Sequence, residues 1–361
     1  MKDSGRPSTI KDVAITAGVS AGTVDRVLHN RGRVSEANSK KVLMAIKKLD
    51  YTPSQLGSAL STSKNLIKIG ITYPQVDSSF WNEIGPGIEK AQRQLKAFGV
   101  RLIINVTHSY SLEDQRKALD SLVKEGVQGI LLTAADDFSA DSIETNIPKH
   151  IPYATVINKT MGSRCLFHIG PDDFILGQLA AKLASLHCCS ETNVLILSPN
   201  VNFTGSQQRI AGFCSKANQE LKDINILRIY PVEGHTDKEI RQNVYDAAMQ
   251  NIRTIDNLNI IYVTDGFFTP AAAAIKDSDM VGKIICIGHE YSSKLSGYLN
   301  EGIMGASIYQ HPAQQWTQAL KKLYSIIRGD EKPTKATIKV QCSILMKETL
   351  PFIRIGDVDF P

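Results

Sequence analysis

Hydrophobic residues follow two different rhythms along the chain. Over about the first 50 residues they recur every three or four positions, which predicts short amphipathic helices at 9–17, 20–28 and 35–49. From Leu66 onward, short continuous apolar runs alternate with amphipathic segments. That alternation is typical of parallel β-sheets covered by helices on both faces. The pattern therefore predicts a small helical part followed by a larger α/β part.

The strands predicted for the larger part are short and almost wholly apolar, and they lie at 67–73, 100–106, 129–133, 153–157, 193–198, 260–264, 283–288 and 305–309. The helices predicted between them lie near 82–98, 112–125, 173–187, 205–222, 237–251, 291–300 and 312–328. So many units over roughly 290 residues exceed one compact sheet, and we predict two doubly wound parallel-sheet lobes. Ligands of such sheets bind at the carboxyl ends of the strands, which here places them between the lobes.

The first two helices carry the signals of a helix-turn-helix unit. Thr9 precedes the first helix and Asp12 follows at capping-box spacing, while Gly18 ends it because glycine adopts a left-handed conformation at little cost. Ser20 then caps a second helix across a tight turn. In such a unit the exposed N-terminal end of the second helix fits a DNA major groove. An ordinary helical hairpin in a protein core has the same pattern, so the rest of the chain must decide.

The charge is unevenly distributed. The formal net charge of the chain is +5. Residues 1–66 hold seven Lys, four Arg and five acidic residues, so the excess of positive charge lies there, and the remainder is close to neutral. A basic end on a neutral body is the electrostatic pattern of a small nucleic-acid-binding domain attached to a larger one. The N-terminus has no apolar segment of the secretory type, and no apolar run reaches the roughly 20 residues of a membrane helix. We therefore expect a cytoplasmic protein with no membrane partner.

Neither metal nor catalytic chemistry has a clear motif. The six cysteines form no C-x-x-C pair, and the run His187-Cys188-Cys189 has no second ligand cluster at suitable spacing. We therefore expect reduced thiols, no metal and no cofactor. The phosphate-binding, dinucleotide-binding, serine-hydrolase and zinc-protease motifs are all missing. The sequence thus predicts a protein that is not an enzyme.

We expect the chain to divide into the following domains. We expect a DNA-binding headpiece over 1–52, a hinge helix and linker over 53–65, a two-lobed body over 66–350, and a tail over 351–361. Within the body, the expected first lobe comprises about 66–165 plus 291–318, and the second about 166–290 plus 319–350.

Two stretches resemble a known family. The segments IKDVAITAGVSAGTVDRVL and RVSEANSKKVLMAIKKLDYTPSQL strongly resemble the headpiece and hinge of the lactose/galactose repressor (LacI/GalR) family of bacterial regulators. The body resembles the periplasmic sugar-binding-protein core of those repressors, particularly the ribose-receptor-like branch. The resemblance implies a cytoplasmic repressor whose affinity for operator DNA is controlled by a small molecule bound between the two lobes.

For DNA, the resemblance places the start of the second helix in the major groove and a hinge leucine in the minor groove. Arg26 fits a bidentate contact to guanine, and Leu60 matches the residue that unstacks a base step. Asp25 stands where the family usually has serine, and it either accepts from cytosine or pairs with Arg26. The polar loop after the second helix suits phosphate contacts. The candidate DNA-binding residues are Thr9, Ser20, Ala21, Gly22, Thr23, Asp25, Arg26, His29, Arg31 and Leu60.

For the effector, the resemblance assigns a ligand site to residues at the strand ends. Phe80 and Trp81 match an aromatic pair that stacks on a sugar ring, although a pair packed in the core has the same pattern. Arg209 is expected to be structural. The candidate effector residues are Phe80, Trp81, Asp136, Asn158, Lys159, Gln207, Asp265, Glu290 and Gln310. An aromatic platform with amides and carboxylates suits a neutral polyhydroxylated effector, and three carboxylates against one lysine disfavour a strongly anionic one.

Three functions remain open from the sequence. The favoured one is a homodimeric, sugar-controlled repressor that reads a pseudo-palindromic operator in double-stranded DNA. The same regulator could instead respond to a non-sugar metabolite such as a nucleobase. A sugar receptor without DNA function is disfavoured by the basic headpiece.

Overall fold

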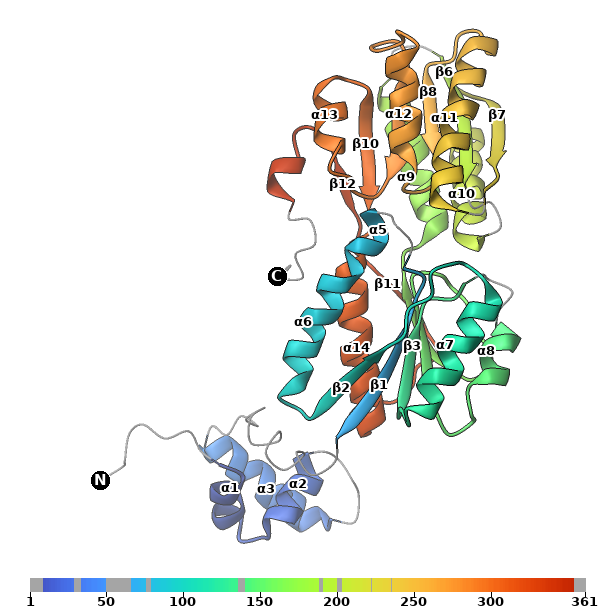
Figure 1. Ribbon diagram of the computed structural model, residues 1–361. Coiled ribbons are helices and arrows are strands. Elements are labelled where there is room, and N and C mark those ends of the chain that lie inside the picture. Colours follow the sequence, from blue (N-terminus) through green and yellow to red (C-terminus); the bar gives the residue numbers. More distant parts are fainter. Residues whose placement is uncertain are drawn as a thin grey trace.

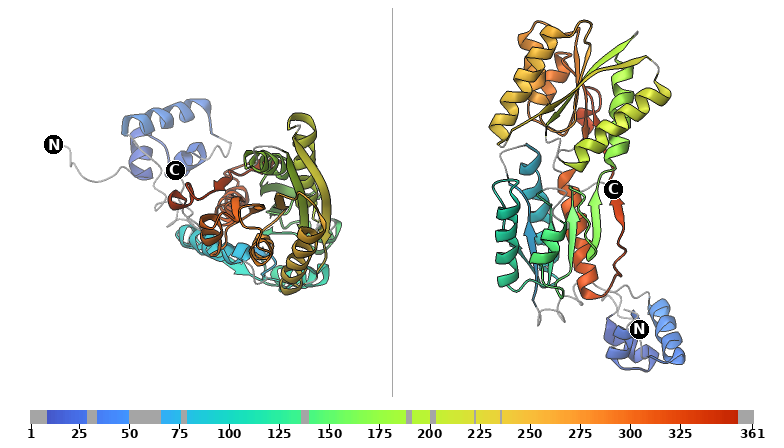
Figure 2. Two further views of the ribbon diagram at one scale, coloured as in Figure 1. Left: turned by 90° about the horizontal axis from the view of Figure 1, so that it is seen from above. Right: turned by 90° about the vertical axis from the view of Figure 1, so that its right-hand side faces the viewer.

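The computed structural model describes residues 9–28, 34–49, 66–75, 79–135, 140–187, 191–199, 203–221, 223–234 and 236–353. The predictions for the hinge segment 53–65 and for most of the tail lie outside these ranges, as do those for His29, Arg31, Leu60 and Asp136. Figures 1 and 2 show two α/β lobes stacked end to end, with a three-helix headpiece beside the far end of the first lobe.

The headpiece has the predicted helix-turn-helix. Its helices are α1 Ile10–Ala17, α2 Ala21–Leu28 and α3 Glu36–Leu49. Thr9 and Asp12 form the expected capping box, and Gly18 ends α1 with a φ of 65°. Val13, Val24 and Val42, one from each helix, are fully buried against one another in a small core. The capping signals read from the sequence therefore fix the two helices as predicted.

The first lobe is a parallel sheet in the strand order β11-β5-β4-β3-β1-β2. Its strands are β1 Ile67–Thr72, β2 Val100–Ile104, β3 Gly129–Leu132, β4 Tyr153–Val156, β5 Cys165–Gly170 and β11 Thr337–Lys339. Its helices are α5 Ser79–Asn82, α6 Ile84–Lys96, α7 Leu112–Lys124, α8 Ala140–Asn146 and α14 Pro312–Arg328. Helix α14 packs against α6, with Trp316 fully buried in the lobe's core.

The second lobe repeats this plan with the strand order β12-β10-β9-β8-β6-β7, in which only β12 runs antiparallel. Its strands are β6 Thr192–Pro199, β7 Ile224–Val232, β8 Ile260–Val263, β9 Ile285–His289, β10 Met304–Tyr309 and β12 Ser343–Leu345. Its helices are α9 Asp173–Leu186, α10 Thr204–Glu220, α11 Asp237–Thr254, α12 Phe268–Asp277 and α13 Leu295–Asn300, and a short 3₁₀ turn, Leu350–Phe352, follows β12. The predicted pair of doubly wound lobes is confirmed.

Helices α9 and α10 pack closely against each other at two glycines, Gly177 and Gly212. A Cβ at Gly177 would lie 2.0 Å from the carbonyl oxygen of Arg209, and one at Gly212 would lie 1.9 Å from that of Phe174. Only a residue without a side chain permits such an approach. It brings the N-terminal ends of both helices together at the edge that faces the first lobe (Figure 1).

The chain crosses between the lobes three times, as predicted, but the predicted lobe boundaries are wrong because the crossings lie at other positions. It crosses after β5, so that strand belongs to the first lobe. It returns after β10, so α13 and β10 belong to the second lobe and the whole of α14 to the first. It crosses again between β11 and β12. In the described part of the chain, no helix has both the length and the hydropathy that a bilayer span requires.

Candidate functional site

A cavity of about 600 Å³ lies between the lobes, at the carboxyl ends of the strands. Its first-lobe wall is formed by Phe80, Trp81, Tyr110, Ile157, Asn158 and Lys159. The crossing segments contribute Pro171, Asp172, Asp173, Phe174, Gln310, Thr337 and Lys339. The second-lobe wall is formed by Phe203, Thr204, Gly205, Ser206, Gln208, Arg209, Arg241, Asp265, Gly266, Phe267 and Glu290. The predicted position between the lobes and most of the candidate effector residues thus coincide in one cavity.

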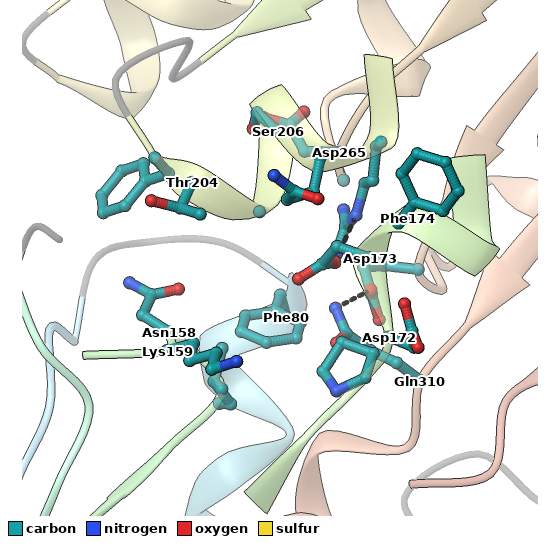
Figure 3. Close-up of a pocket in the computed structure, with 18 of the residues that line it drawn as sticks. Phe80, Asn158, Lys159, Asp172, Asp173, Phe174, Thr204, Ser206, Asp265 and Gln310 are labelled. Carbon is teal, nitrogen blue, oxygen red and sulfur yellow. Dashed lines mark hydrogen bonds and ion pairs between the residues drawn. The ribbon is translucent and has the colours of Figure 1, made fainter. Parts of the chain in front are cut away.

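Aromatic rings form one continuous wall of this cavity. Phe80 meets Trp81 edge to face with ring centroids 5.0 Å apart, and the indole Nε1 of Trp81 donates to the Tyr110 hydroxyl at 2.9 Å. Tyr110 in turn meets Phe203 of the second lobe, at 5.6 Å between centroids. Figure 3 shows Phe80 in the middle of the cavity, half-buried, between Asn158 and Lys159 on one side and the crossing segments on the other.

Trp81 combines the two roles that the sequence left open. Its side chain is buried and stacks on Tyr73 at 6.2 Å between centroids, as a core residue does. It also lines the cavity and holds Tyr110 in place. Phe80 is therefore the ring of the pair with more of its surface left for a ligand.

The two residues after β4 lie on the first-lobe wall. Ile157 has a φ of 70°, a left-handed conformation that turns the chain into the cavity. Asn158 donates from Nδ2 to the carbonyl oxygen of Ala134 at 3.0 Å, which leaves its amide oxygen available to a ligand. Lys159 is exposed within the cavity.

Acidic and basic side chains balance in the cavity, which corrects the excess of carboxylates in the predicted set. The described lining residues include four acidic and four basic ones, namely Asp172, Asp173, Asp265 and Glu290, and Lys159, Arg209, Arg241 and Lys339. Several of these charges pair with one another. Arg209 donates from Nε to Asp173 at 2.8 Å and from Nη1 to the carbonyl oxygen of Thr264 at 2.8 Å. Lys339 lies 2.6 Å from Asp172.

Arg209 is structural, as expected, but it also lines the cavity. Its side chain is buried, and its ion pair joins α10 to the start of α9. Asp172 caps α9 by accepting from the backbone N–H of Ile175 at 3.2 Å. The pair of carboxylates after β5 therefore holds two basic groups in place at the crossing between the lobes.

Glu290 is the most unusual group in the cavity. Its side chain is 3% exposed, and Oε1 accepts from Nε2 of Gln310. Its Oε2 has no hydrogen-bond partner among the described residues. Burial raises the pKa of Glu290 to about 8, against the opposing influence of the Arg209 guanidinium. A buried carboxyl with an unsatisfied oxygen at a cavity wall is suited to hydrogen-bonding a ligand hydroxyl or N–H.

A second carboxyl joins the lobes close to the cavity. Glu83, between α5 and α6, accepts from the hydroxyl of Tyr309 at the end of β10. Burial raises the pKa of Glu83 to about 7, while the bond from Tyr309 acts to lower it. The two residues belong to different lobes, so their hydrogen bond ties the lobes together.

One predicted effector residue does not line the cavity. Gln207 of α10 is exposed and outside the lining, whereas its neighbours Gln208 and Arg209 line it. Successive helical residues point about 100° apart, so a shift of one position exchanges a cavity residue for a surface residue. Asp265, by contrast, lies in the lining, where Oδ1 accepts from the backbone N–H of Phe267 at 3.0 Å.

Sequence reasoning missed several lining residues. Asp172 and Asp173 follow β5, which the apolar pattern did not predict, and so they were not expected at the end of a strand. Tyr110, Phe203 and Arg241 lie in loops and first helical turns without any motif.

The headpiece presents the predicted surface. Ser20, Ala21, Gly22 and Arg26 are exposed on α2, while Val24 on the opposite side is buried. Ser20 accepts at Oγ from the backbone N–H of Thr23 at 3.1 Å, which caps the helix. The two hydroxyls lie 2.9 Å apart and hydrogen-bond each other. Asp25 and Thr23 are half-buried on the same helix.

Known protein families match both the headpiece and the two-lobed body. Residues 9–54 match the family of bacterial regulatory proteins called the lacI family, and residues 69–331 match the periplasmic binding protein domain. The chain is 26% identical over 348 residues to the ribose operon repressor of Lactococcus lactis subsp. lactis. The aligned region covers 95% of this chain and 98% of that repressor. It is 48% identical over 82 residues, about a quarter of each chain, to the transcriptional regulator RegA of Clostridium acetobutylicum.

The body also resembles solved structures. A carbohydrate transporter solute-binding protein from Agrobacterium radiobacter, in complex with D-arabinose, superposes with a TM-score of 0.71 at 15% identity. The match covers 79% of this chain and 96% of that one, and at this identity it establishes the fold. Headpiece, body and relatives agree: the chain belongs to the periplasmic binding protein domain family and has a lacI-family DNA-binding domain at residues 9–54, the combination of a DNA-binding transcriptional repressor with a small-molecule effector rather than of an enzyme.

Proposed function

We propose that this repressor controls genes of carbohydrate metabolism and that its effector is a neutral sugar bound between the lobes. The observation that carries the proposal is the cavity itself, in which aromatic rings stand opposite amide and carboxyl groups and two of the carboxylates are paired with basic side chains of the protein. That combination suits a ligand with an apolar ring face and many hydroxyls. Two similar proteins are named ribose operon repressors, which supports the same effector class.

In this proposal each wall has a role. Phe80 supplies the stacking face, with Trp81 holding it from behind. Asn158 and Lys159 hydrogen-bond hydroxyls from the first lobe. Asp265, Glu290 and Gln310 do so from the second lobe and the crossing segment. Because a bound sugar would touch both lobes, it would favour their closed arrangement and so shift the population of DNA-binding repressor.

On DNA, we propose that the N-terminal end of α2 enters the major groove. The exposed Arg26 would read guanine, and the small Ala21 and Gly22 would allow close approach of the helix to the bases. Thr9, Ser20 and Thr23 would contact phosphates or bases beside them. His29, Arg31 and Leu60 retain the roles expected from the sequence. We also propose that the repressor is cytoplasmic.

We further propose a homodimer that reads a pseudo-palindromic operator. Exposed apolar side chains lie on one edge strand of each sheet, Ile104 on β2 and Leu227 and Ile229 on β7. Uncovered edge strands with apolar side chains favour association. A second copy covering them would pair two headpieces, as two half-sites require. Sedimentation at micromolar concentration tests this, and a persistent monomer would contradict it.

Thermal unfolding against a panel of sugars, polyols and nucleobases tests the effector. A ligand at a hundred times its dissociation constant adds about 2.7 kcal/mol of stability. We expect a sugar to raise the unfolding midpoint of the wild type but not of a Phe80→Ala variant. Phe98→Ala is the matched control, since Phe98 is also half-buried in the first lobe but lies outside the cavity. If only nucleobases raise the midpoint, the repressor responds to a nucleobase and the sugar proposal is wrong.

A further inference from the structure

A second cavity, of about 810 Å³, adjoins the effector cavity. Tyr110 and Arg241 line both of them, so the two spaces are neighbours with a shared wall. Like the first cavity, the second lies between the lobes. His108 and Ser109 contribute from the segment after β2 of the first lobe, and the first turns of α11 contribute from the second lobe. We call the two spaces the inner and the outer cavity.

Each of the two shared residues contacts a ring of the inner cavity. Tyr110 meets Phe203, which lines the inner cavity alone, with ring centroids 5.6 Å apart. The guanidinium of Arg241 lies 5.3 Å from the ring centroid of Phe267, another residue of the inner cavity. A ligand that extends past the Tyr110 and Arg241 side chains would touch both cavities.

The outer cavity offers the same kinds of groups as the inner one. Gln242 is an exposed amide on α11, and Tyr245, one turn further, is a half-buried ring. The Tyr245 hydroxyl donates to Asp277 at 2.9 Å, which fixes the ring's position. His108 faces them from the other lobe. An aromatic ring with an amide and an imidazole suits a further sugar unit, as Phe80 with Asn158 does in the inner cavity.

We propose that the outer cavity is a second effector subsite and that the repressor binds a two-unit carbohydrate, with one ring in each cavity. This inference rests on the proposed carbohydrate function and specifies the size of its effector. A ligand in both cavities would contact the lobes at the crossing segments and again at α11. It would therefore hold the closed arrangement more firmly than a single sugar does.

Titration calorimetry on the full-length repressor tests the proposal. The ligands are D-ribose, D-glucose, D-galactose and D-fructose on one side and sucrose, lactose, maltose and melibiose on the other. The variants are Gln242→Ala and His108→Ala, whose exposed side chains line only the outer cavity. Gln250→Ala is the matched control, because Gln250 is also an exposed glutamine of α11 but lies outside both cavities.

We expect one of the disaccharides to bind more tightly than either of its component sugars. Gln242→Ala should weaken that disaccharide about three- to tenfold, as the loss of one hydrogen bond does, and leave the component sugar unchanged. Gln250→Ala should change neither. A monosaccharide that binds as tightly as every disaccharide overturns the inference but keeps the sugar effector. If Gln242→Ala loses the same affinity for the disaccharide and for its component sugar, the inference is also overturned and the sugar effector is kept. If no sugar of either size binds, the proposed carbohydrate function fails as well.

Discussion

Replacing Glu290 by glutamine should stabilise the repressor and weaken its effector binding. The buried carboxyl has a pKa of about 8, whereas the ordinary value is 4.5. In the unfolded chain it ionises near that ordinary value, so at neutral pH folding must move it towards the protonated form. Each pKa unit between the pH and the unfolded value is worth 1.36 kcal/mol, which amounts to a cost of about 3 kcal/mol at pH 7. Glutamine keeps the shape and the acceptor for Gln310 without this cost.

The pH dependence gives the prediction its sign. A carboxyl whose pKa is raised on folding leaves the protein most stable below pH 4.5, and the free energy of unfolding falls as pH rises towards 8. Glu290→Gln should therefore exceed the wild type by about 1 kcal/mol at pH 5 and by about 3 kcal/mol at pH 7. Gains of this kind commonly cost function where a strained site serves a ligand. Sugar affinity should fall, because a carboxyl oxygen at the position of Oε2 can accept a hydrogen bond in either protonation state, whereas the amide nitrogen of glutamine can only donate.

Urea unfolding at pH 5, 7 and 8 measures this difference. Circular dichroism is the suitable probe, because both tryptophans, Trp81 and Trp316, belong to the first lobe and Glu290 follows β9 of the second. Glu89→Gln is the control, since Glu89 is an exposed carboxylate on α6. A stability difference for Glu290→Gln that is the same at pH 5 and pH 8 would refute the reasoning.

Three further predictions concern the helix contact, the link between the lobes and the DNA surface. Gly212→Ala should destabilise the repressor by about 1–3 kcal/mol, because its Cβ would lie 1.9 Å from a backbone oxygen; Gly297→Ala, with open space around it, should be neutral in the same urea titration. Tyr309→Phe removes the hydroxyl that donates to Glu83. The variant should lose more free energy of unfolding at pH 8, where Glu83 is ionised, than at pH 5. An equal loss at both pH values would contradict a hydrogen bond between the lobes. Arg26→Ala should weaken binding to a selected operator by about 1–3 kcal/mol and relax the preference for one base pair, as read by fluorescence anisotropy with substituted duplexes.

The headpiece was predictable because its signals are local. Thr9, Asp12, Gly18 and Ser20 specify caps that depend on a few neighbouring residues, and the structure has each of them. The buried parallel strands were predictable for a similar reason, since strands covered on both faces are apolar without interruption. Strand β1, for example, is buried along most of its length and was found within one residue of its ends.

Strands without that property were missed. In β7, an edge strand, most of the residues from Asn225 to Pro231 are exposed or half-buried, so the continuous apolar run is broken by Asn, Arg and Pro. Strand β5 was missed too, which hid the carboxylates that follow it. Strands β11 and β12 have three residues each and carry no periodicity. The lobe boundaries failed for a different reason, because the three crossings are set by which sheet each strand joins, and no local pattern records that.

The most direct test of the account is the affinity for operator DNA with and without the effector. The operator would be selected from random duplexes with the full-length repressor, and its dissociation constant measured by anisotropy at fixed salt. We predict that a saturating sugar changes that constant by about 5- to 150-fold, the usual range of allosteric coupling, and that Phe80→Ala removes the change while keeping the affinity without sugar. The same dissociation constant with and without every sugar that binds the cleft would contradict the claim that the cleft controls the headpiece.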